Sequence, residues 1–192
     1  VGAFRDAVRF GDEAAEAAEP DRYIFHSAHV FNELMQYCVG HMDTILWRHI
    51  SGGKAPPPTD GRAGAKRGAA DSPDTQPHWR KHQPLVKSYL TQLVRFLDKL
   101  TEASMALVVL QQLHRMVSLV IVFPKLIPKA LKALLQAWGR QTDSTERSSR
   151  LLAYATVRRL VLESPRPLFD ESFKGLYLTY ARTSSGTTRA SL

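Results

Sequence analysis

Apolar residues recur every three or four positions along most of the chain, which is the spacing of an amphipathic helix. Before residue 52, this pattern predicts one helix around residues 4–18 and another over about 23–50. After residue 82 it predicts five more, over about 84–100, 103–122, 125–140, 145–163 and 168–183. Apolar and polar residues alternate nowhere for long enough to predict a strand. The pattern therefore indicates an all-α protein.

The later helices are expected to pack as antiparallel pairs. Helices of roughly 16–20 residues that are joined by short connections pack as antiparallel neighbours. Several apolar faces are broad enough to be covered on two sides, which favours a HEAT- or armadillo-like helical-repeat solenoid over a four-helix bundle, although the bundle stays open. The residues expected in the core are Leu110, Leu113, Leu131, Leu134, Trp138, Phe173 and Tyr177.

A segment poor in apolar residues interrupts this pattern. Residues 52–82 contain a run of three prolines and several glycines, and such a composition buries too little surface to offset the entropy lost on ordering. We expect a long flexible, basic linker here. It would join two N-terminal helices in residues 1–51 to a helical-repeat segment in residues 83–185. Residues 186–192 are expected to form a frayed tail.

Charge is unevenly distributed along the chain. The 192 residues carry a net charge of +8 and have a pI near 9.8, which points to acidic partners such as nucleic acid. Residues 1–51 hold four Lys or Arg against eight Asp or Glu, residues 52–82 hold six against three, and residues 83–192 hold sixteen against seven. The basic character therefore lies in the second half, and such asymmetry often separates two roles.

Composition also bears on compartment. Hydrophobic residues make up 44% of the chain, enough for a sizeable core. Cys38 is the single cysteine, so no disulfide forms within the chain and we expect a reducing compartment. The apolar stretch 107–123 contains two glutamines, a histidine and an arginine near its centre, so we expect a buried helix and no membrane partner. The chain begins at Val1 without a cleavable leader, and we expect it to be part of something longer.

The order of motifs in the second half resembles the nucleolar complex protein 2 family. The stretch "FPKLIPKALKALLQAWG" is followed by "RLLAYATVRRLV" and "FKGLYLTYART", and the resemblance covers about residues 77–185. It implies a helical-repeat protein of the nucleus and nucleolus that forms a heterodimer with other nucleolar complex proteins. The resemblance further implies a role in assembly of the large (60S) ribosomal subunit precursor, near pre-rRNA, and no enzymatic activity. Two departures are the long insertion and a C-terminal end without the family's basic-aromatic continuation.

One cluster has the spacing of a metal site but not the geometry. His26, His29, Cys38 and His41 read as HxxH followed by CxxH. On a single helix, the nine residues from His29 to Cys38 correspond to about 13.5 Å of rise, too far for ligands that must lie about 2 Å from one zinc ion. We therefore expect no metal and no cofactor. No phosphate-binding loop or nucleophile elbow occurs either, so we expect no catalytic residues.

The basic residues of the second half are candidate contacts for RNA or for an acidic protein. Lys125, Lys129 and Lys132 share one face of their predicted helix. Stacked hairpins would align them with further basic residues along one edge, which attracts phosphate without reading base sequence. An ordinary solvated surface is the alternative. The further candidates are Arg158, Arg159, Arg166, Lys174 and Arg182.

Three functions follow from these observations. The first is a non-enzymatic scaffold in maturation of the large ribosomal subunit and in rRNA processing, which acts through protein–protein contacts. The second is a general nucleic-acid-binding helical module, in which the basic edge dominates. The third is an enzyme with an all-α site that none of the motifs reveals.

Overall fold

The computed structural model describes residues 1–9, 23, 27–54, 72–100, 102–140, 144–165 and 167–189, and these residues form helices and no strand. The prediction of an all-α protein is therefore confirmed. No helix in this part of the chain is long and apolar enough to cross a membrane. The elements are α1 (Gly2–Arg9), α3 (Ala28–Ser51), the 3₁₀ turn η2 (Pro73–Thr75), α4 (Trp79–Lys99), α5 (Ala103–Arg115), α6 (Val117–Val120), α7 (Ile127–Gly139), α8 (Ser144–Glu163) and α9 (Phe169–Arg189).

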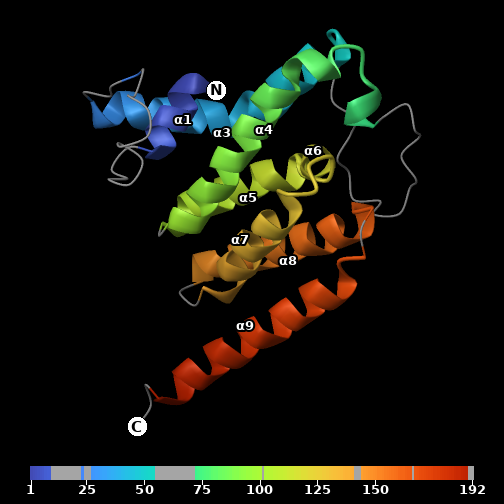
Figure 1. Ribbon diagram of the computed structural model, residues 1–192. Coiled ribbons are helices and arrows are strands. Elements are labelled where there is room, and N and C mark those ends of the chain that lie inside the picture. Colours follow the sequence, from blue (N-terminus) through green and yellow to red (C-terminus); the bar gives the residue numbers. More distant parts are fainter. Residues whose placement is uncertain are drawn as a thin grey trace.

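Figure 1 shows the helices as a stack, with α1 and α3 near one end, α5, α7 and α8 in the middle and α9 at the other end. At one end α1 and α3 pack on α4, and α4 packs in turn on α5 and α7. The largest interfaces of the stack join α8 to α5 and α7, and α9 rests mainly on α7. Contacts therefore pass from layer to layer, and α1 and α9 lie at opposite ends of the stack.

A continuous hydrophobic core runs through these layers. The rings of Phe4 and Tyr89 lie 5.0 Å apart in its first layer, and both side chains are fully buried. The Tyr89 hydroxyl donates a hydrogen bond of 3.0 Å to the Cys38 carbonyl oxygen, which satisfies the phenol inside the core. The expected core leucines Leu110, Leu113, Leu131 and Leu134 are all at most 5% exposed.

Helix α4 begins inside the segment expected to be a linker. Its first residue, Trp79, is 5% exposed and packs its ring 5.7 Å from that of Phe123. The backbone N–H of His78 also donates to the Ile50 carbonyl, at 3.1 Å. The expected boundary at residue 82 was wrong because a single buried aromatic anchors the helix start, while the middle of the linker, residues 55–71, lies outside the described residues.

Two other helix ends differ from the sequence pattern. The helix expected over 103–122 ends at Arg115, and Met116 begins a tighter turn in which its N–H is shared between the Gln112 and Leu113 carbonyls. At the C-terminal end, α9 extends to Arg189 and includes part of the expected frayed tail, of which residues 190–192 lie outside the described chain.

Candidate interaction surface

Helix α9 is held on α7 by closely packed small residues. A Cβ atom added to Gly139 of α7 would collide with the Thr179 side chain, and one added to Gly175 of α9 would collide with the Leu135 side chain. Gly175, Thr179 and Thr183 recur at intervals of four residues, so they lie along one face of α9. This small-residue face is therefore the side of α9 that packs against α7.

A different face of α9 carries large aromatic side chains that are mostly exposed to solvent. We call it the α9 aromatic face, and its members are 60–66% exposed. Two of its rings stack nearly parallel, with centroids 6.2 Å apart. Contiguous exposed apolar patches on a protein surface mark interaction sites. The α9 aromatic face consists of Phe169, Phe173, Tyr177 and Tyr180.

The expectation that Phe173 and Tyr177 lie in the core was therefore wrong. Their helical spacing identifies an apolar face of the helix. It does not say whether the neighbouring helix packs against this face or against the small-residue face. Here the glycine-and-threonine face permits the closer approach and takes the contact with α7. The recurrence of small residues at 175, 179 and 183 was the sequence signal that could have indicated this.

Helix α8 places two adjacent arginines in different environments. Arg158 is exposed on the outer face, which also carries Leu151, Tyr154 and Leu162. Arg159 is only 8% exposed and donates to the His114 carbonyl oxygen at 2.7 Å and to a carboxylate oxygen of Glu163 at 2.8 Å. The interpretation of Arg159 as an RNA contact was wrong, because its guanidinium joins α8 to α5.

The other basic candidates lie on the surface of several elements. Lys129 and Lys132 are exposed on α7, but Lys125 lies in the turn before that helix, so the three do not share one helix face as expected. Lys174 and Arg182 are exposed on α9. Arg166 lies outside the described residues.

Trp138 lies at the edge of the core rather than within it. Its ring is partly buried, and the Arg150 guanidinium lies over it at 5.8 Å from the ring centroid.

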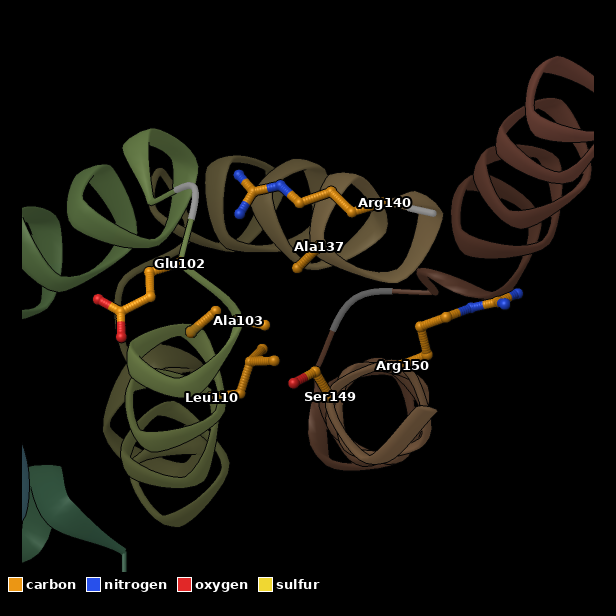
Figure 2. A pocket seen from close by; sticks show the side chains of 8 residues that line it. Glu102, Ala103, Leu110, Ala137, Arg140, Ser149 and Arg150 are labelled. Atoms are coloured by element: carbon orange, nitrogen blue, oxygen red, sulfur yellow. The ribbon is translucent and has the colours of Figure 1, made fainter. Parts of the chain in front are cut away.

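Figure 2 shows the small pocket nearby between α5, α7 and α8, with the side chain of Arg150 directed away from it. The Ser149 hydroxyl lines this pocket, is buried and has no hydrogen-bond partner among the described atoms. This lining brings together no acid–base pair or nucleophile–base pair that could carry catalysis.

Of the four residues with metal-like spacing, the structure describes three. His26 lies outside the described residues, while His29, Cys38 and His41 lie on α3. Cys38 is buried, and burial raises the pKa of its thiol. Among the residues described by the structure, no group of three or more His, Cys, Asp or Glu could hold a metal ion.

Comparison with known proteins gives relatives over nearly the whole chain, although no protein-family model matches it. The chain is 29% identical to the nucleolar complex-associated protein 2 of Arabidopsis thaliana, over 93% of this chain and 22% of that protein. It is 24% identical to the nucleolar complex protein 2 of Drosophila melanogaster, over 82% of this chain and 18% of that protein. It is also 26% identical to an uncharacterised NOC2 family protein of Schizosaccharomyces pombe, over 98% of this chain and 24% of that protein.

The matched region is a small part of each relative, and the chain spans about a fifth of the length of the curated relatives it matches. The identities are modest but recur in a plant, an insect and a yeast. The resemblance expected from the sequence is therefore confirmed: curated nucleolar complex protein 2 homologues from several species match this chain over most of its length.

Proposed function

We propose that this chain is part of a non-enzymatic nucleolar factor that helps to assemble and mature the precursor of the large ribosomal subunit. The relatives are named for a nucleolar complex, and those names support the nucleolus as the place of action. The scaffold role rests on one structural observation, the α9 aromatic face. We infer that a second nucleolar complex protein covers this face and that the two form a heterodimer.

We further propose that the helices form a HEAT- or armadillo-like solenoid. The layer-to-layer packing in Figure 1 supports this arrangement, since successive helices contact their neighbours in the stack and the two ends stay apart. Solenoids expose extended surfaces and need covered end layers. The mostly exposed aromatic face of α9, the last helix of the described stack, is a surface that such a fold could present to a partner.

The physical case for a protein partner is the chemistry of the face. Phenylalanine and tyrosine are enriched in protein–protein interfaces because each buries a large area at low entropic cost, and the tyrosine hydroxyl still finds a polar partner. Phe173 and Tyr177 lie near the middle of the aromatic face, where the residues that contribute most to binding are generally found. We expect these two rings to anchor the partner.

The test is co-purification with a matched control. Phe173→Ser and Tyr177→Ser are introduced together into the full-length protein, which is then recovered from nuclei and probed for the other nucleolar complex proteins and for large-subunit precursor rRNA. The control replaces Val30 and Tyr37 by serine; these side chains are 55% and 56% exposed on α3. We expect the α9 variant to lose the partner and the α3 variant to keep it.

Two outcomes would contradict this reading. If both variants keep the partner and the precursor rRNA, the aromatic face is not the heterodimer interface. If the α9 variant instead lowers the melting temperature of the purified full-length protein, the rest of that protein covers the face. The general nucleic-acid-binding module is the second candidate function. It is favoured by exposed basic side chains at the end of α3 and the start of α4, among them Arg48, Arg80 and Lys81.

A further inference from the structure

The end of α3 and the start of α4 bring basic side chains together from two distant parts of the sequence. The backbone bond from His78 to the Ile50 carbonyl joins the two segments, and the rings of His49 and His82 lie 5.5 Å apart. Figure 1 shows these helix ends side by side, at the other end of the stack from α9. The α3–α4 basic junction consists of Arg48, His49, Lys54, His78, Arg80, Lys81 and His82.

Within the described residues, no acid is paired with the exposed lysines and arginines of this junction. Residues 45–54 and 76–87 contain no Asp or Glu. Arg48, Lys54, Arg80 and Lys81 are exposed and form no ion pair with any acid in the described part of the chain. Partial burial and the neighbouring charges of His49, Lys81 and His78 lower the pKa of His82, as expected in a positive field.

Stability does not account for all of these cations. Arg48 and His49 lie in the last turn of α3, where positive charge is favourable to the helix dipole. Arg80 and Lys81 lie in the first turn of α4, where cations are unfavourable and where this helix has no acid. Residues that contradict a local preference of this kind, here the preference for acids in the first turn of a helix, are typical of functional sites when they bring no benefit to folding.

We propose that the α3–α4 basic junction binds single-stranded RNA through its phosphate backbone. Lysine and arginine neutralise phosphates, while imidazole and guanidinium planes offer surfaces on which unpaired bases stack. The large apolar side chains of the junction, Ile50 and Trp79, are buried. The centre of a protein–protein interface is generally depleted of charged residues and enriched in aromatic ones, so this charged surface fits a polyanion better. This inference goes beyond the proposed scaffold role and concerns a different face of the molecule.

The experiment compares two triple variants that remove the same charge. The junction variant is Arg48→Gln, Arg80→Gln and Lys81→Gln, and the control is Arg95→Gln, Lys99→Gln and Arg147→Gln, at positions outside the junction and outside the candidate RNA contacts. All six side chains are exposed, so melting temperature serves to check that both variants fold. The affinity of the 192-residue chain for a labelled single-stranded RNA of mixed sequence is measured by fluorescence anisotropy across a salt series.

We expect the junction variant to reduce the steepness of the slope of log affinity against log salt by about 2. The reason is that each phosphate contact to a single strand contributes roughly 0.7 to this slope. At roughly 0.1 M salt this corresponds to a loss of about 100-fold, which shrinks as salt rises. The control variant should change the slope much less. A charge-keeping variant, Arg48→Lys with Arg80→Lys, should retain most of the slope.

Several results would overturn the proposal. One is an unchanged slope in the junction variant, and another is an equal or larger change in the control. Competition by polyglutamate as effective as that by RNA would assign the junction to an acidic protein. Loss of binding to phosphatidylserine vesicles, with RNA binding unchanged, would assign it to a lipid surface. The Phe173→Ser, Tyr177→Ser variant should keep its RNA slope, so failure here and failure of the scaffold role are distinguishable.

Discussion

Arg140 ties the end of α4 to the end of α7, and replacing it by alanine tests whether this single side chain stabilises the stack. Its guanidinium donates to the carbonyl oxygens of Leu97 at 3.2 Å and Asp98 at 2.9 Å, and also to that of Leu100. Carbonyls in the last turn of a helix have no donor within the helix, so they need a partner from outside. Arg140→Ala removes that partner from three of them at once.

The magnitude follows from which carbonyls water can reach. The Asp98 carbonyl group is exposed and will be hydrated in the variant, whereas those of Leu97 and Leu100 are partly buried. A hydrogen bond that involves a charged group contributes about 1.5–3 kcal/mol, and partial exposure reduces that value. We therefore expect Arg140→Ala to lower the free energy of unfolding by about 2 kcal/mol, which in a chain of this length lowers the melting temperature by roughly 4–8 °C.

Urea denaturation followed by far-ultraviolet circular dichroism measures this change. Arg140→Lys keeps the charge but not the planar fork of donors, so it should recover only part of the loss. Arg158→Ala is the matched control, because Arg158 is exposed on the outer face of α8 and should change stability by less than about 0.5 kcal/mol. If Arg140→Ala is no more destabilising than this control, water satisfies the α4 carbonyls and the reasoning is refuted.

Three further predictions concern other parts of the chain. Trp138→Ala should cost about 1.5–3 kcal/mol in denaturation experiments, less than the 3–5 of a fully buried ring, because Trp138 is only partly buried beneath Arg150; a cost above that range would place the ring in the core. Replacing residues 55–71 by a short Gly/Ser linker should leave the melting temperature unchanged, and a cooperative loss of helix would contradict this. Burial and the charge of Arg159 lower the pKa of His114, so its contribution to stability is complete above the ordinary pKa of about 6.5 and is lost as pH falls below that value and through the lower pKa of the folded state. His114→Asn should therefore flatten the pH dependence of the denaturation midpoint between neutral and acidic pH, and an unchanged dependence would exclude His114 as its source.

The amino-acid sequence by itself determined the helical class and most of the helices. The recurrence of apolar residues every three or four positions is a local property of the sequence. It gives each helix an apolar stripe whatever that helix later packs against. Leu110 and Leu113 on α5, like Leu131 and Leu134 on α7, are buried because their neighbours cover both sides of these helices. The stretch "FPKLIPKALKALLQAWG", which carries part of the resemblance to nucleolar complex protein 2, contains the buried stripe of α7, and its residues are recognisable without a structure.

Only the tertiary structure decided which surfaces stay exposed, because the spacing of apolar residues along one helix does not identify the helix that packs against it. The aromatic residues of α9 have the same spacing as a core stripe, yet α7 packs against a different, small-residue face and leaves Phe173 and Tyr177 exposed. Arg158 and Arg159 are adjacent in sequence, but the turn of α8 sends one to solvent and the other into the α5 interface. The α3–α4 basic junction depends on packing as well, since residues about thirty positions apart share a surface only after α3 and α4 have folded against each other.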